Sequence, residues 1–341
     1  MRLLLLPAIF CLNSILGCTT NLSSKQVDAG VLVSEFIYDE APFPQCHAST
    51  IVKTDKGLLA SWFGGTYERH PDVSIYISEC LNGIWSSPTL VADGVINDTL
   101  RYPCWNPVLF KRENNDLVLY YKVGPSPSEW WGLYKISTDN GKTWSESIHI
   151  PDQLLGPIKN KPCRLPNGSI LYPTSYETEK EWGIYTETSD RELKDWNKTP
   201  IDNNGFNAIQ PTILFHDSGM IQMLCRSKEK KIVETWSSDL GKTWTPVEAT
   251  SLPNNNSGID AITLHNGLFL LVCNPLEQGR NKLSVLVSSD GKSWKDLIVL
   301  EDHAEGEFSY PAIIEDEGKV HITYTYNRIK IRYVLLEIRE K

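Results

Sequence analysis

Short runs of apolar and β-branched residues recur along almost the whole chain, and tight polar turns separate them. Each run begins with one polar or aromatic residue, continues with apolar residues, and ends in a turn such as KTDKG, LPNG or HDSG before a second apolar run. This alternation predicts β-strands joined as hairpins, and no segment shows helical periodicity. The six clearest runs are HASTIV, NPVLF, KPCRL, QPTILF, DAITL and YPAII.

The runs return at a regular interval along the chain. A second series supports the same interval, because the turns STDNGKTW, SSDLGKTW and SSDGKSW and the degraded copy TSDRELKDW all end in tryptophan. Both series step by about fifty residues, which is typical of a β-propeller. Six starts predict an all-β, six-bladed propeller over residues 33–341. The starts are His47, Asn106, Lys161, Gln210, Asp260 and Tyr310, and the tryptophans are Trp85, Trp144, Trp196, Trp244 and Trp294.

The repeated turn is predicted to be structural and to join the outer strands of a blade. Its aspartate can accept backbone N–H groups, its glycine supplies a positive φ, and its tryptophan can pack between blades. The segments VLVSEFIYDE near the start and IRYVLLEI at the end are both strand-like. One of them is expected to complete a blade begun at the other end of the chain, which would close the ring without free edges.

The first residues, MRLLLLPAIFCLNSILGC, have the layout of an export signal. One arginine precedes a short apolar run, and a small residue precedes Cys18. The ILGC stretch resembles a bacterial lipoprotein signal, in which the cysteine becomes the lipidated first residue. We therefore predict a signal peptide over residues 1–17, lipidation at Cys18 and a flexible tether over residues 18–32. The protein would be exported and held at a membrane surface by lipid alone, in the periplasm or at the cell surface.

Replacing Cys18 with alanine is expected to release the protein from the membrane fraction, because the acceptor of the lipid is lost. Fractionation of cells that express each form measures this. Continued membrane association of the Cys18→Ala protein would show that another anchor exists.

Composition narrows the possible partners. The chain has 341 residues and a formal net charge of -9, which argues against nucleic acid or an anionic membrane as a partner of the surface at large. A local basic pocket for an acidic ligand stays possible. Beyond Cys18, the six cysteines are scattered, which favours buried free thiols over disulfides. No motif predicts a metal site, no cofactor is expected, and the protein is expected to be a monomer.

The tryptophan-terminated turns are the Asp-box, or BNR, motifs of the sialidase superfamily, and the chain resembles that superfamily over essentially its whole mature length. The stretches WFGGTYERHPDV, PCWNPVLF, GPIKNKP and EFSYPAII are similar to a bacterial branch labelled predicted neuraminidases. The resemblance implies a glycosidase that grips a substrate carboxylate with three arginines. It also implies a tyrosine nucleophile assisted by a glutamate, with an aspartate as acid and base.

Carried over by position, the resemblance assigns Arg226 in LCRS and Arg280 in GRNKL to the carboxylate grip. It assigns Tyr310 to the nucleophile and Asp72 in ERHPDV to the acid and base. Two positions depart from the pattern. His47 stands where the first blade should supply an arginine, and Gln210 stands where the glutamate partner of the tyrosine should be.

Further candidates follow from where a propeller places its strands. The first strand of each blade lines the central tunnel, so the six starts should converge on one mouth, and the second strands should add residues to the same face. The adjacent aromatics Trp130 and Trp131 are candidates for stacking on a sugar. The substrate-binding candidates, besides the two arginines, are Glu68, Lys122, Lys161, Glu177, Asp260 and Trp130, with Lys159 adding positive potential.

Three functions fit these residues. The first is an exo-acting glycosidase on an acidic terminal sugar, with Asp72 or a nearby carboxylate as acid. The second is a uronate lyase, in which His47 and Tyr310 serve as base and acid while the arginines neutralise the uronate. The third is a non-catalytic glycan-binding lipoprotein. Each predicts an acidic oligosaccharide as the partner.

Overall fold

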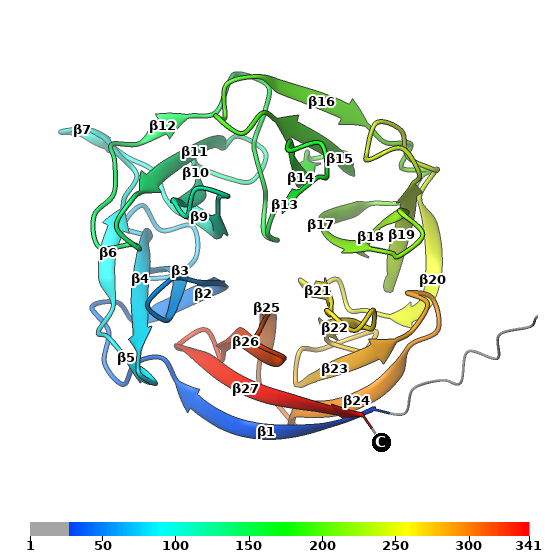
Figure 1. The fold of residues 1–341 in the computed structure, drawn as a ribbon. Helices are drawn as coiled ribbons and strands as arrows, with labels where there is room; N and C mark the ends of the chain where they lie inside the picture. The colour runs from blue at the N-terminus through cyan, green and yellow to red at the C-terminus, as the bar shows by residue number, and fades with distance from the viewer. Residues whose placement is uncertain (1–26, 341) are drawn as a thin grey trace, which may run out of the picture.

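A computed structural model describes residues 27–340, which form a ring of six β-sheets around a central axis (Figure 1). The part of the chain that the structure describes contains no α-helix. Each blade is an antiparallel sheet whose first strand lies nearest the axis. The predicted six-bladed β-propeller is therefore confirmed.

The strands follow one another from the axis outward in five of the blades, and the sixth combines both ends of the chain. Blades 1 to 3 consist of β2 (Gln45–Lys53), β3 (Leu58–Gly65), β4 (Ser74–Leu81), β5 (Ile84–Trp85) and β6 (Thr89–Ala92); β9 (Cys104–Lys111), β10 (Leu117–Val123), β11 (Trp131–Ser137) and β12 (Ile148–His149); and β13 (Cys163–Arg164), β14 (Ile170–Glu177), β15 (Trp182–Ser189) and β16 (Trp196–Pro200). Blades 4 to 6 consist of β17 (Ala208–Phe215), β18 (Ile221–Ser227), β19 (Lys231–Ser237) and β20 (Glu248–Pro253); β21 (Asp260–Thr263), β22 (Phe269–Cys273), β23 (Lys282–Ser288) and β24 (Lys295–Asp302); and β25 (Phe308–Asp316), β26 (Lys319–Tyr326), β27 (Lys330–Glu340) and β1 (Val27–Phe36). The short pair β7 (Val95–Asn97) and β8 (Leu100–Arg101) lies in the connection between blades 1 and 2.

The two ends of the chain close the ring, as the sequence predicts. β1 pairs antiparallel with β27 along its whole length, from Val27 opposite Glu340 to Phe36 opposite Arg332. The closure also corrects one predicted boundary, because residues 27–32 belong to β1 and not to the tether. Their side chains lie on an outer strand and stay partly exposed, so the sequence there looks like a linker. The predicted signal peptide and Cys18 lie outside the described residues.

The Asp-box turns have the predicted structural role. In the first of them, Asp139 accepts the backbone N–H and the hydroxyl of Thr143 at 2.9 and 2.6 Å. These bonds lower the pKa of Asp139 to about 2. The Trp144 indole donates to the carbonyl of Gly141 at 3.0 Å. The same bonds recur at Asp239 and Trp244, so the turn repeats because the blade repeats.

The tryptophans of these turns pack between neighbouring blades. Trp244 of blade 4 contacts a buried cluster that contains Leu171 of blade 3. Trp85, which belongs to the same tryptophan series but to no Asp-box turn, meets Tyr333 of blade 6 edge to face, with ring centroids 5.2 Å apart. The six described cysteines are unpaired, and all but Cys163 are buried. Within residues 27–340, no helix has the length and apolar character that crossing a bilayer requires.

Candidate active site

Four inner strands begin with a β-bulge at the end of the blade where the predicted site residues lie. Pairing with the second strand shifts register at this point in blades 1, 2, 4 and 6. The bulge residue has a positive φ of 35° at Asn106, 55° at Gln210 and 53° at Tyr310, and in blade 1 it is Ala48, with 58°. Non-glycine residues rarely adopt this conformation, and such outliers concentrate at functional sites.

Tyr310 is the centre of the site. Its hydroxyl accepts a hydrogen bond of 2.7 Å from Nη1 of Arg226, and the same nitrogen donates to Oε1 of Gln210 at 3.2 Å. Nε2 of Gln210 lies 3.4 Å from the tyrosine oxygen. Arg226 is buried and is further held by Asn256, whose Oδ1 accepts from Nε at 2.8 Å. The tyrosine, the arginine and the glutamine that the sequence singled out are therefore in direct contact.

Two more guanidinium groups complete the positive side of the site. Arg280 lies 5.8 Å from the centroid of the Tyr310 ring and forms an ion pair of 2.8 Å with Glu307. The same carboxylate oxygen of Glu307 accepts from Nε of Arg328 at 2.8 Å. One glutamate therefore orients both Arg280 and Arg328. Together with Arg226 they give the site three guanidinium groups, although His47 stands where the first arginine was expected.

Arg328 and Glu307 were missed in the sequence. Arg328 stands in the turn between β26 and β27, and its carbonyl accepts the backbone N–H of Cys46, next to His47. The guanidinium thus lies beside the position that lacks an arginine, and it also pairs with Glu68. No motif marks the YNRIK turn. Only its position, one hairpin after the tyrosine strand, could have indicated it.

His47 packs against the tyrosine but is sealed from solvent. The two ring centroids are 4.1 Å apart, and neither imidazole nitrogen has a hydrogen-bond partner or measurable solvent exposure. Burial is the main cause that holds the pKa of His47 well below its usual value, with Arg328, Arg280, Arg226 and Lys159 adding to it. His47 is therefore a neutral packing partner of Tyr310 here, and this placement does not bring it to a substrate as a base.

Lysines of the third blade hold the floor of the site together. The buried ammonium of Lys159 donates to the carbonyl of Ile259 at 2.9 Å and contacts the carbonyl of Pro311, next to Tyr310. Lys161 forms an ion pair of 2.7 Å with Asp260, which is buried and also accepts from the Thr212 hydroxyl. Lys161 and Asp260 were predicted to bind substrate, but they satisfy each other across the tunnel.

Burial lowers the pKa of Lys122 and of Lys159 to about 7, from 10.5 in an exposed lysine. Between these values the unfolded chain binds more protons than the folded one, so stability must rise with pH. We expect the free energy of unfolding to increase by about 2 kcal/mol for each lysine between about pH 6.5 and pH 8.5. Urea unfolding at both pH values measures the rise, and Lys122→Met should remove about half of it. A free energy of unfolding that is the same at both pH values would contradict the burial of the two ammonium groups.

Three carboxyl groups near the mouth, those of Glu177, Asp72 and Glu68, differ in burial and in their bonding partners. Burial raises the pKa of Glu177, although Arg226 and Lys228 oppose the shift, and Glu68 adds to it. Asp72 is partly exposed, and burial alone would raise its pKa. Its bonds with Thr66 and His70 outweigh burial, however, and lower the pKa overall. Glu177 is therefore better suited than Asp72 to carry a proton at neutral pH, whereas Glu68 is committed to Arg328.

Lys122 and Trp130, which were predicted to bind substrate, are packed within the fold. Lys122 is fully buried and donates to the carbonyl of Pro157 at 2.8 Å. Trp130 packs edge to face against Trp105, with ring centroids 5.9 Å apart, and only 9% of it is exposed. Sequence reasoning missed a different aromatic residue, Trp182, whose ring lies 5.8 Å from the guanidinium of Arg226.

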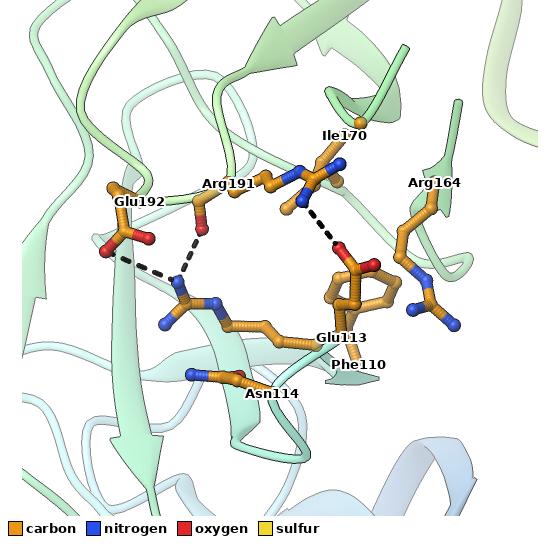
Figure 2. Close-up of a pocket in the computed structure, with 9 residues that line it drawn as sticks. Phe110, Glu113, Asn114, Arg164, Ile170, Arg191 and Glu192 are labelled. Carbon is orange, nitrogen blue, oxygen red and sulfur yellow. Dashed lines mark hydrogen bonds and ion pairs between the residues drawn. The ribbon is translucent and has the colours of Figure 1, made fainter. Parts of the chain in front are cut away.

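A separate cavity of about 310 Å³ lies between the β9–β10 turn and blade 3 (Figure 2). Inner strands run from the mouth to these turns, so the cavity is on the opposite face of the ring. Figure 2 shows Arg191 paired with Glu113. These two groups lie 3.1 Å apart, and Arg112 pairs with Glu192 at 3.8 Å. The cavity contains none of the predicted site residues.

No group of histidine, cysteine, aspartate and glutamate within residues 27–340 could hold a metal ion.

The fold and the site define a sialidase-like propeller. Residues 56–322 match the model of the BNR repeat-like domain, and the chain belongs to that family. No curated protein matches the chain.

Solved structures with the same fold include several sialidases. A protein of unknown function from Dyadobacter fermentans has a TM-score of 0.76 and 16% identity, over 91% of this chain and 99% of that one. The NanB sialidase from Streptococcus pneumoniae, as a mutant, has a TM-score of 0.73 and 12% identity, over 89% and 70%. The intramolecular trans-sialidase from Ruminococcus gnavus, solved with oseltamivir carboxylate, has a TM-score of 0.70 and 13% identity, over 89% and 96%.

Proposed function

We propose that the protein is an exo-acting glycosidase that removes a terminal acidic sugar from a glycan. The observation that carries the proposal is the contact of 2.7 Å between Arg226 and the hydroxyl of Tyr310, a partly exposed residue, with two further guanidinium groups nearby. Guanidinium groups hold carboxylates well because their planar fork donates two parallel hydrogen bonds. Related propellers named as sialidases support the reaction class.

In the proposed reaction the arginines bind the sugar carboxylate and place the anomeric carbon at Tyr310. The phenol oxygen attacks that carbon, and the glycosidic oxygen leaves with a proton from Glu177. Water then attacks the anomeric carbon and gives a proton to the Glu177 carboxylate. The bond between that carbon and the tyrosine oxygen breaks, and the released phenolate regains a proton from solvent. A guanidinium that donates to the phenol oxygen stabilises negative charge on it. Gln210 cannot accept the phenol proton, so this proton must pass to water.

The missing base affects the choice of substrate. Without a side chain that accepts the phenol proton, the attack by Tyr310 is hindered, so we expect slow release of sialic acid from ordinary sialosides. An acidic sugar of another type, such as a uronic acid, is the substrate that we favour. The sealed nitrogens of His47 favour hydrolysis over β-elimination, because a lyase base must touch the substrate.

One assay separates the alternatives. The protein is incubated with uronate-containing and with sialylated oligosaccharides, and two signals are followed. A free reducing sugar without new ultraviolet absorbance supports the hydrolase, whereas absorbance from a 4,5-unsaturated product would show a lyase. Binding without either product would show a non-catalytic lectin. Rapid release of sialic acid would restore an ordinary sialidase.

Replacing Glu177 with glutamine is expected to lower kcat by about 10²- to 10⁴-fold, because the leaving group loses its proton donor. The pH–rate profile of the variant should lose its alkaline limb. Asp72→Asn is the matched control and should change kcat much less, since the low pKa of Asp72 leaves that group without a proton. The opposite order of effects would return the acid role to Asp72.

Lipidation and export remain part of the proposal and rest on the sequence around Cys18. A tether after the lipidated cysteine would hold the propeller at a membrane surface, where glycans outside the cytoplasm are accessible.

A further inference from the structure

A second cavity of about 310 Å³ opens between blades 2 and 3, which are neighbours in the ring (Figure 1). Its position relative to the candidate active site follows from strand register. Trp131 at the start of β11 is opposite Val123, which in turn is opposite Cys104 at the start of the inner strand β9. The cavity therefore lies on the same face as the mouth of the tunnel.

Aromatic rings form much of the lining of this cavity. They belong to Trp130, Trp131, Tyr176 and Tyr185. The Tyr176 and Tyr185 rings lie 6.3 Å apart and are inclined by only 33°. The ammonium of Lys198 stands 3.8 Å from the centroid of the Tyr185 ring. Pockets that combine aromatic walls with a few polar groups are typical small-molecule sites.

Polar side chains stand around the same cavity. His149, Asp152 and Gln153 line it and are exposed, so their donors and acceptors are available. Lys198 and Asp152 carry opposite charges, and the lining therefore has no net positive charge to attract an anion. This differs from the tunnel mouth, where three guanidinium groups gather. An occupant with apolar C–H faces, many hydroxyl groups and no charge fits these features best.

The wall formed by the loop of residues 150–158 is fixed without a ligand. The buried carboxylate of Glu187 accepts the backbone N–H groups of Leu155 and Gly156 at 2.8 and 2.7 Å, and Lys122 donates to Pro157. Gly132 lets this loop approach closely, because a Cβ there would lie 2.5 Å from the Leu155 carbonyl oxygen. A preformed wall lowers the entropic cost of binding.

We propose that this cavity is a second carbohydrate-binding site, which takes an uncharged sugar unit against the rings of Trp131 and Tyr176. The loop that forms its wall leads directly into Lys159, which supports Tyr310. The site thus shares a face and a supporting segment with the candidate active site. It needs no catalytic activity at the tunnel mouth and holds equally if the protein is a lectin.

Saturation-transfer NMR with lactose, cellobiose and maltose tests the proposal on the intact propeller. We expect at least one of these neutral sugars to bind at millimolar concentration. Tyr176→Ala should weaken that binding by about tenfold, since a stacking ring is lost, and Lys198→Ala should weaken it less. Trp236→Ala is the matched control, because this ring on blade 4 also lies near a lysine, with Lys292 Nζ 5.0 Å away, and lines no part of the cavity.

Arg280→Ala distinguishes this site from the tunnel mouth and should leave neutral-sugar binding unchanged. Loss of that binding in Arg280→Ala would place the sugar in the mouth and overturn the proposal. So would the absence of binding by all three sugars, or unchanged binding in both Tyr176→Ala and Lys198→Ala. Thermal unfolding checks that each variant is folded. If the Tyr176→Ala protein does not fold, Lys198→Ala decides the test, because Lys198 is exposed and its replacement should not disturb the fold.

Discussion

Replacing Tyr310 with phenylalanine is expected to lower kcat/KM by on the order of 10³-fold or more, because the nucleophilic oxygen is removed. The ring itself stays, so its packing against His47 and its proximity to Arg280 should persist. The loss should fall mainly on kcat, since the carboxylate grip is untouched. Steady-state kinetics on the preferred acidic glycoside, with thermal unfolding as a check of the fold, measures the effect.

Tyr121→Phe is the matched control for this substitution. It also removes one phenol oxygen, which bonds Ser147 at 2.6 Å and has no hydrogen bond to Tyr310 or the three arginines. It should reduce stability slightly and leave kcat/KM unchanged. Comparable activity losses in the two variants, or full activity in Tyr310→Phe, would remove the tyrosine from the mechanism. Fast sialoside cleavage that depends on Tyr310 would instead show that Gln210 does not prevent the usual reaction.

Replacing Arg280 with alanine is expected to weaken binding of an acidic sugar by about 2–5 kcal/mol, as when one partner of a desolvated charge pair is removed. Arg280 is the most direct test of the grip, because Arg226 already donates to Asn256, Gln210 and Tyr310. Without Arg280, Glu307 would keep Arg328 as its cationic partner and the Ser309 hydroxyl as a neutral donor, and its less compensated charge would repel the ligand carboxylate. Calorimetric titration with an acidic sugar and its uncharged methyl ester measures the difference.

Arg280→Lys supplies the matched control, since it keeps the charge but loses the planar fork. It should recover only part of the affinity. Equal losses for the acid and the ester in Arg280→Ala would reject carboxylate recognition at the mouth. A circular dichroism melt must accompany each titration, because the ion pair with Glu307 also joins blade 5 to blade 6.

The residues of the site differ in how far their environment could be foreseen. Arg226, Tyr310 and Gln210 begin or end strands of the repeat, so the period itself brought them to one mouth. Lys122 and Trp130 occupy similar sequence positions but are buried by the loop of residues 150–158 and by Trp105. The repeat predicts which end of a blade a residue occupies. It does not predict which loop of the neighbouring blade covers that residue.

The sequence by itself determined the six blades, the Asp-box turns and the closure of the ring by both chain ends, because each depends on local patterns that recur every blade. The tertiary structure alone decided the third guanidinium at Arg328, the carboxylate of Glu307 that orients two arginines, and the sealing of His47. These features arise from contacts between blades far apart in sequence. Arg328 reaches the position beside His47 only because the ring closes blade 6 against blade 1, and no repeat within a single blade encodes that contact.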